Sequence, residues 1–305
     1  MASSRVELNN YLVFKDEFVA EFCSGVNVLI GANGTGKTTL LRAMSSNIGY
    51  IEYHRSLPDM PGKLIVEDGA MLLSMDNVST VSESHEKLHS IYIPEKDVLE
   101  HAKGLLTFIE QKQTGFSDIY RSVLIAAQDV PTNKQTAMQI ALCSKIADVI
   151  GGEVHWDKGE GTFYTLKVDG ARVPFSNEAS GYKKFGFLGL LISSGQLAHD
   201  SILFWDEPEN SLNPELIPIL VDILLELSRN GVQIFVATHS EILASYFAVN
   251  REKGDIVMFT SLYKDGEQIK ANTSDRFDLL EPNNLTAEPV RLYEKEIVKG
   301  LGGNV

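Results

Sequence analysis

Hydrophobic and polar positions in the first third of the chain follow patterns that are typical of strands. Alternating and then continuous apolar runs predict three strands between residues 5 and 30, and the last, Val26–Ile30, is apolar enough to be buried. Another short apolar run, Ser90–Pro94, predicts a strand that a proline closes. Apolar runs joined by Asp-Gly pairs predict hairpins at Asp68-Gly69, Asp169-Gly170 and Asp265-Gly266.

The pattern changes between residues 97 and 150, where apolar residues recur three and four positions apart. This spacing predicts three helices, at residues 97–111, 117–128 and 133–150. Gly151 and Gly152 are a helix-stop signal. Strands resume at residue 153.

The chain from residue 180 onward alternates helices with buried strands. After a first helix, the pattern predicts strands at Ser201–Trp205, Val232–Ala237 and Asp255–Thr260, with helices at Pro214–Arg229 and Glu241–Val249 between them. Such alternation indicates parallel strands joined by crossover helices. A last helix is expected near Ala287–Lys299. The fold class is therefore α/β, with a mostly parallel core sheet, an N-terminal antiparallel β part and a helical subdomain.

One stretch carries a specific chemical pattern. Residues Gly31–Thr38 read G-A-N-G-T-G-K-T, which is the complete G-x-x-x-x-G-K-[ST] phosphate loop, and a buried strand precedes it while a helix follows. In this loop the backbone of Asn33, Gly34, Thr35 and Gly36 curls around phosphate oxygens, and the helix N-terminus faces the same anion. Lys37 would reach the β- and γ-phosphates, Thr38 would ligate Mg²⁺, and Thr39 would contact the α-phosphate. The pattern predicts a P-loop NTPase.

Polar residues follow two of the predicted buried strands. Asp206 and Glu207 end the first, at the carboxyl edge where ligands of α/β sheets bind. We expect Asp206 to hold Mg²⁺ and Glu207 to polarise the attacking water. His239 ends the second strand, which should neighbour the first, and it is expected to donate to the γ-phosphate.

These residues together resemble the ATP-binding-cassette ATPases, and specifically their non-transporter branch of RecF-like, structural-maintenance-of-chromosomes and overcoming-lysogenization-defect heads. The likeness covers nearly the whole chain. It implies one ATPase domain over residues 1–305, with nucleotide-binding lobes at 1–95 and 153–305 and a helical insertion at 97–150. It also implies ATP as the nucleotide, a catalytic role for Glu207, His239 and Lys37, and Ser211–Pro214 as the loop that crosses a dimer interface.

The family's signature segment, close to L-S-G-G-Q, has a partial counterpart here. Ser180 and Gly181 match it, whereas Tyr182 and Lys183 depart from it. In the family this segment covers the γ-phosphate held by the opposite subunit, so the resemblance implies a head-to-tail homodimer around two ATP molecules. Lys183 either adds charge there or is a solvated helix residue. Where relatives carry a glutamine this chain has Glu95 and Lys96, and Tyr11 or Phe14 either stacks on adenine or belongs to the core.

A competing motif lies at His85–His89, where H-E-K-L-H fits the H-E-x-x-H pattern of zinc peptidases. That chemistry needs both histidines on one helix face and a third ligand. A strand is expected immediately afterwards, and the sequence offers no convincing third ligand. A solvated segment is the favoured interpretation.

Charge and composition limit the partners. The formal net charge of −14 argues against a surface broadly adapted to nucleic acid. A local basic strip remains an open alternative, and its candidates are Lys183, Lys184, Arg291, Lys295 and Lys299. Two cysteines, no signal-peptide pattern and no run of about 18 apolar residues predict a cytoplasmic protein that does not enter the membrane.

The sequence thus predicts a soluble ATPase that uses ATP and Mg²⁺ to drive or gate an unidentified partner protein. The resemblance places such work in defence against phage or in DNA maintenance. Two alternatives stay open. One is the energising subunit of a membrane transporter, and the other is a slow nucleotide-gated scaffold or sensor.

Overall fold

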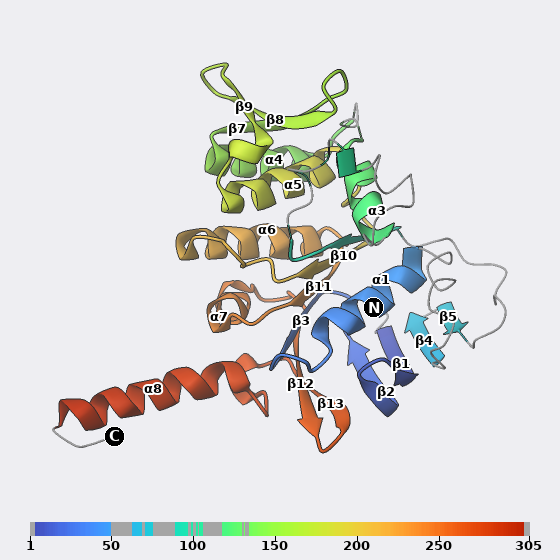
Figure 1. The fold of residues 1–305 in the computed structure, drawn as a ribbon, viewed down its shortest axis with the longest axis vertical. Coiled ribbons are helices and arrows are strands. Elements are labelled where there is room, and N and C mark those ends of the chain that lie inside the picture. Colours follow the sequence, from blue (N-terminus) through green and yellow to red (C-terminus); the bar gives the residue numbers. More distant parts are fainter. Residues whose placement is uncertain are drawn as a thin grey trace.

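A central six-stranded sheet, counted within the described part of the chain, organises the fold (Figure 1). The structure is a computed structural model, and it describes residues 4–49, 63–68, 71–75, 89–96, 118–129 and 134–301, together with residues 99, 102, 104, 105 and 131. The strands of the central sheet are β3 (Val26–Gly31), β6 (His89–Ile93), β10 (Ser201–Asp206), β11 (Gln233–Ala237), β12 (Val257–Asp265) and β13 (Gln268–Ser274). Their order is β13-β12-β3-β11-β10-β6, and every neighbouring pair is parallel except β12 with β13. The predicted parallel sheet with crossover helices is confirmed.

Helices and a second sheet cover both faces of the central sheet (Figure 1). Helix α1 (Lys37–Gly49) lies on one face, and α6 (Ile217–Arg229) and α7 (Glu241–Asn250) lie on the other. Strand β3 shows the consequence, because Val28 packs into the cluster that contains the α6 side chains while Leu29 packs into the cluster of α1. A strand that is buried on both faces has to be apolar without interruption, which explains why Val26–Ile30 lacks alternation.

Among the residues that the structure describes, two smaller antiparallel sheets flank the central one. The first has the order β2-β1-β4-β5 and the second β7-β8-β9. Their strands are β1 (Ser4–Tyr11), β2 (Phe14–Phe22), β4 (Lys63–Asp68), β5 (Met71–Met75), β7 (Gly152–Asp157), β8 (Thr162–Lys167) and β9 (Arg172–Pro174). All three predicted hairpin pairings are found, β4 with β5, β8 with β9 and β12 with β13. Gly170 and Gly266 have φ of +86° and +62°, which explains the glycine of these turns.

Helices α4 (Ala137–Ile150) and α5 (Ser180–Ser193) pack beyond α6, whereas α3 (Asp118–Ala127) packs against α5 and β6 (Figure 1). Thr136 and Gln139 form a capping box at the start of α4, and Gly151 ends that helix in the left-handed conformation with φ of +67°. Gln139 Nε2 also donates to the Ile192 carbonyl at 3.0 Å, which joins α4 to α5. Most of the helix predicted at residues 97–111 lies outside the described residues.

The helix predicted from Pro214 is divided in two. A 3-10 turn, η4 (Pro214–Leu216), precedes α6, and Asn213 caps it by accepting from the Glu215 amide at 3.3 Å. Pro218 then falls in the first turn of α6, where a missing N–H has no helical acceptor to lose. The proline therefore marks a helix start and not a kink inside the helix. Two further 3-10 turns are η3 (Phe175–Asn177) and η5 (Phe277–Leu279).

The last helix, α8 (Asn284–Gly300), runs away from the rest of the protein and has no buried residue (Figure 1). Within the described part of the chain, no helix is both long and apolar enough to cross a membrane. Cys23 is buried, Cys143 is half-buried, and both are free thiols.

Helix α6 provides a test of the core, because Leu224 is fully buried against the central sheet. Leu224→Ala should lower the free energy of unfolding by about 2–5 kcal/mol, since it removes apolar contacts and leaves a cavity. The measurement is chemical denaturation. Ile140→Ala on the solvent side of α4, where the side chain is 55% exposed, is the control and should have little effect.

Candidate functional site

The phosphate loop connects β3 to α1 through residues whose backbone only glycine adopts easily. Gly36 has φ of +91°, and a Cβ there would lie 2.7 Å from the Phe14 ring. A Cβ on Gly31 would lie 2.3 Å from the Leu262 carbonyl oxygen. Packing against β2 and β12 thus enforces the two glycines that begin and end the loop.

Side chains of the loop hold it in this shape. The Thr35 hydroxyl donates to the Ala32 carbonyl at 2.8 Å, and Lys37 Nζ donates to the Gly31 carbonyl at 2.7 Å. Asn33 and Gly34 lie exposed at the tip, whereas Thr38 and Thr39 are half-buried in the first turn of α1. This first turn contains no acidic residue, so the positive N-terminal end of the helix remains free of a competing carboxylate from its own sequence.

Lys37 places a positive charge among the acids of the site. Its side chain is almost fully buried, at 5% exposure, and burial lowers the pKa of its ammonium to about 8. The negative charges of Glu207, Asp206 and Glu209 oppose that shift in the pKa. The structure therefore brings the predicted lysine and both predicted acids to one edge of the sheet.

The acids come from the end of β10. Asp206 is its last residue and is buried, between the parallel neighbours β6 and β11. Glu207 leaves the strand with φ of +48°, a left-handed conformation that is strained for a residue with a side chain, and its amide donates to the Ala237 carbonyl at 2.9 Å. The turn directs Glu207 away from the path of the strand.

His239 and Glu207 face each other. His239 Nε2 lies 3.3 Å from Glu207 Oε1, because β11 and β10 are parallel neighbours that end at the same edge. Burial, followed by the charges of Glu95, Asp206 and Glu209, raises the pKa of Glu207. Burial and then the Lys37 charge lower the pKa of His239, so at neutral pH the imidazole is uncharged. The raised pKa makes Glu207 a stronger base than an exposed glutamate.

Three residues near these acids were not predicted from the sequence. The Tyr92 hydroxyl, on β6, donates to Asp206 Oδ2 at 3.1 Å, and Arg42 Nε donates to that hydroxyl at 3.4 Å. Burial, and then the Asp206 charge, raises the pKa of Tyr92, so the phenol keeps its proton. Glu209 Oε1 accepts from the Thr238 hydroxyl and from the His239 amide, which fixes the loop after β11. These partners are far apart in the sequence, and only the folded structure shows that they lie next to one another.

A lysine joins the helix that begins at Ser180, the expected signature segment, to the turn that follows Asp206. Ser180 lies exposed at the start of α5, and Gly181 is buried where a Cβ would lie 3.0 Å from Leu212 Cδ1. Lys184, one turn later, donates to the carbonyls of Glu207 at 2.9 Å and Pro208 at 3.1 Å. Among the residues described, no hydrogen bond joins Ser180 or Gly181 to the phosphate loop of the same chain.

These contacts correct the interpretation of two lysines. Lys183 is 6% exposed, so its description as a solvated helix residue is wrong. Lys184 holds the carbonyls of the Glu207 turn, and it therefore does not belong to a surface strip for nucleic acid. Arg291, Lys295 and Lys299 lie exposed on α8, and their proposed contact with nucleic acid stays a prediction.

The structure also describes the surroundings of the residues whose roles the sequence left open, at positions 95 and 96 and at positions 11 and 14. Glu95 is exposed next to the acids, and its Oε1 accepts from Asn210 Nδ2 at 2.8 Å. Lys96 is also exposed. Phe14 is fully buried and packs against Phe18 with ring centroids 4.5 Å apart, so it belongs to the core and not to an adenine site. Tyr11 is half-buried beside the same core cluster.

The zinc-like motif falls mostly outside the described residues, which include His89 but not residues 85–88. His89 begins β6 and pairs with Ser201 of β10, so it belongs to a strand. The described ranges contain no group of three His, Cys, Asp or Glu residues placed to hold a metal ion.

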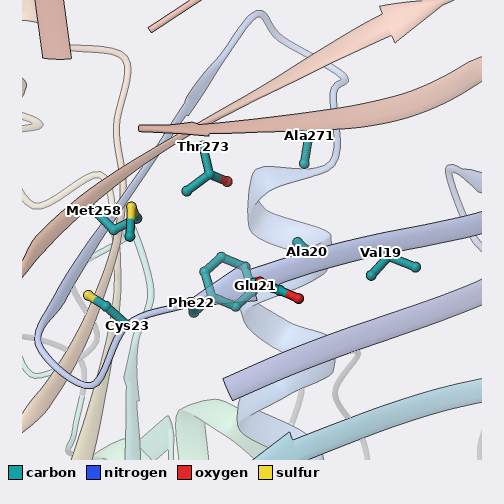
Figure 2. A pocket seen from close by; sticks show the side chains of 8 residues that line it. All are labelled: Val19, Ala20, Glu21, Phe22, Cys23, Met258, Ala271 and Thr273. Atoms are coloured by element: carbon teal, nitrogen blue, oxygen red, sulfur yellow. The ribbon is translucent and has the colours of Figure 1, made fainter. Parts of the chain in front are cut away.

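A hollow of about 420 Å³ lies elsewhere, between β2 and the β12–β13 pair (Figure 2). Its lining is Val19, Ala20, Glu21, Phe22, Cys23, Met258, Ala271 and Thr273. None of these residues belongs to the phosphate loop or to the acids around Lys37. The hollow is thus separate from the candidate site at the edge of the sheet.

The residues at the sheet edge fit a triphosphate with Mg²⁺. The loop offers an ammonium and helix amides to phosphate oxygens, and the glycines leave room at its surface. The Thr38 hydroxyl and the Asp206 carboxylate are oxygen donors of the type that Mg²⁺ prefers. The donor set is suitable for such a ligand.

Comparisons with known proteins agree with this chemistry. The family described as "AAA domain, putative AbiEii toxin, Type IV TA system" matches residues 73–245, and a second AAA-domain family matches residues 5–57. A search of the curated proteins found no match.

Among solved structures, the fold is similar to that of SMC head domains. The SmcHead bound to the C-winged helix domain of ScpA has a TM-score of 0.55 at 11% identity, over 88% of this chain and 96% of that one. The SMC head domain from Thermotoga maritima has a TM-score of 0.50 at 15% identity, over 90% and 99%. The Smc head domain bound to the C-terminal domain of ScpA from Pyrococcus furiosus has a TM-score of 0.51 at 9% identity, over 97% and 99%. At these identities the likeness shows the fold, an α/β P-loop NTPase head.

Burial of Lys37 has a consequence for stability that can be measured. Its folded-state pKa of about 8 is below the 10.5 of an unperturbed lysine, so between pH 8 and 10 the unfolded chain binds more protons there. Raising the pH through this window should therefore stabilise the wild type relative to Lys37→Met. Denaturant unfolding at several pH values measures the difference. Lys158→Met, at an exposed residue of the β7–β8 turn, is the control and should show no such trend.

Proposed function

The chain belongs to the family described as "AAA domain, putative AbiEii toxin, Type IV TA system", and from this premise we propose that it is an ATP hydrolase that drives or gates a partner protein. The observation that carries the proposal is the meeting of Lys37, Asp206, Glu207 and His239 at one edge of the parallel sheet. Lys37 follows the phosphate loop after β3, Asp206 and Glu207 stand at the end of β10, and His239 follows β11, and the arrangement has the chemistry that triphosphate hydrolysis requires.

Binding uses the loop and the acid. The amides of Asn33–Thr39 and the Lys37 ammonium hold the phosphates of ATP, while Thr38 and Asp206 hold Mg²⁺. A cation held by these two residues would supply positive charge beside the phosphate oxygens. For this step Lys37 exchanges its backbone acceptors, the Gly31 and Ala32 carbonyls, for phosphate oxygens.

Hydrolysis uses the residues opposite the loop. Glu207 accepts a proton from the attacking water, and its raised pKa and its strained turn support this role. His239, uncharged at neutral pH and 3.3 Å from Glu207, donates to the γ-phosphate. Glu209 holds the backbone of His239 and thereby sets the distance between the two strand ends.

A second copy of the chain completes the site. Ser180 is exposed at the start of α5, where a hydroxyl and helix amides are free to cover a phosphate. We propose a head-to-tail homodimer in which Ser180 and Gly181 of each copy cover the ATP held by the other. Closure on ATP and opening after hydrolysis would then pass work to a partner protein. Lys184 supports such coupling, because it joins the signature helix to the Glu207 turn of the same chain.

The setting we propose is defence against phage or DNA maintenance. The family description names a toxin–antitoxin system, and two of the similar structures are heads bound to domains of ScpA. These descriptions support a partner protein for this chain.

Glu207→Gln should reduce ATP turnover by about 10²- to 10⁴-fold, because the amide cannot accept the proton of the attacking water. ATP binding should persist, since Glu207 does not hold the phosphates. Phosphate release and calorimetric ATP binding measure the two quantities. Glu160→Gln, in an exposed turn, should leave both unchanged. An unaltered turnover rate in Glu207→Gln would refute the assigned base.

Ser180→Arg should abolish the dimer that forms with ATP but not the binding of ATP by the monomer, because the added side chain fills the space between copies. Light scattering in the Glu207→Gln background, with and without ATP, gives the oligomeric state. Val168→Arg is the matched control, at a turn residue that is 90% exposed. A dimer that persists in Ser180→Arg would contradict the composite site.

A further inference from the structure

Tyr92 connects the metal-binding acid to the neighbouring strand. Tyr92 and Phe204 are paired residues of the parallel strands β6 and β10, and Asp206 follows two positions later on β10. The Tyr92 hydroxyl donates to Asp206 Oδ2 at 3.1 Å, and both side chains are buried, at 6% and 4% exposure. A buried phenol needs such a partner, so this hydrogen bond fixes the rotation of the carboxylate.

Arg42 extends this connection to the helix that follows the phosphate loop. Its Nε donates to the Tyr92 hydroxyl at 3.4 Å, which leaves the phenolic proton directed to Asp206. Arg42 lies four residues after Thr38 on α1, and residues at this spacing share one face of a helix. The chain of contacts from Arg42 through Tyr92 to Asp206 therefore joins the two elements that carry the oxygen donors.

We propose that Tyr92 is a positioning residue for the Mg²⁺ that accompanies the nucleotide, an inference that rests on the proposed function. By occupying Oδ2, the hydroxyl orients the Asp206 carboxylate so that Oδ1 is available to the cation or to its water ligands. Groups that hold a metal-binding carboxylate from outside set its orientation and affect metal affinity. Phenylalanine would fill the same space in the core, so packing alone does not require the hydroxyl.

Tyr92→Phe keeps the ring and removes the hydroxyl, which donates to Asp206 and accepts from Arg42. The experiment measures the affinity for a non-hydrolysable ATP analogue by calorimetry at a series of Mg²⁺ concentrations. Its readout is the Mg²⁺ concentration at which half of the gain in nucleotide affinity is reached. A second arm measures the affinity in EDTA. We expect the half-saturating concentration to rise about tenfold or more in Tyr92→Phe, with nucleotide affinity in EDTA within about twofold of the wild type. Arg42→Met should shift the Mg²⁺ requirement in the same direction and by less, because it frees the phenol to rotate without removing it.

Tyr164→Phe is the matched control. It deletes a phenolic hydroxyl from β8, which belongs to a different sheet from the strand that carries the acids, and its ring stacks on His155. This variant should change neither quantity. An unchanged Mg²⁺ requirement in Tyr92→Phe overturns the inference while leaving the proposed function standing. A loss of affinity in EDTA to the same extent also overturns it, because the variant would then disturb the phosphate loop itself. A wild type whose nucleotide binding is independent of Mg²⁺ would refute the proposed function.

Discussion

The burial of the Lys37 ammonium beside carboxylates at the edge of a parallel sheet is the constraint on which the site depends. A charge with 5% exposure is unstable in a protein interior unless opposite charges or hydrogen-bond acceptors surround it. Here Asp206, Glu207 and Glu209 supply the charges, and two carbonyls of the loop supply acceptors. Since the acids follow β10 whereas the lysine and its carbonyl acceptors belong to the loop after β3, the sheet must bring these two segments together with little freedom.

Parallel pairing provides that arrangement. Strands β3, β11 and β10 are neighbours and end at the same edge, so the pairing of the strands brings the phosphate loop, His239 and the two acids together there. The strands are apolar on both faces because α1 covers one side and α6 and α7 the other. Their burial holds the strand ends in register, and the polar residues of the site gather at and just after the carboxyl ends of the strands.

Side chains from outside the motifs then connect the edge to the rest of the fold. Lys184 ties α5 to the Glu207 turn, Glu209 ties that turn to the loop after β11, and Tyr92 ties Asp206 to β6. A movement of α5 would therefore be transmitted through Lys184 to the carbonyl of Glu207. This connection joins α5 directly to the backbone of the residue that follows Asp206.

The sequence by itself determined the phosphate loop, the two acids, His239 and the alternation of strands and helices, because these depend on local patterns. Gly266 illustrates this, since its positive φ is a local requirement of the β12–β13 turn and a Cβ there would meet no other atom. The tertiary structure alone decided that Lys183 is buried, that Lys184 binds the carbonyls of Glu207 and Pro208, and that Tyr92 reaches Asp206. Such contacts join residues that are far apart along the chain, and a side chain's neighbours across a sheet leave no periodic trace in the sequence.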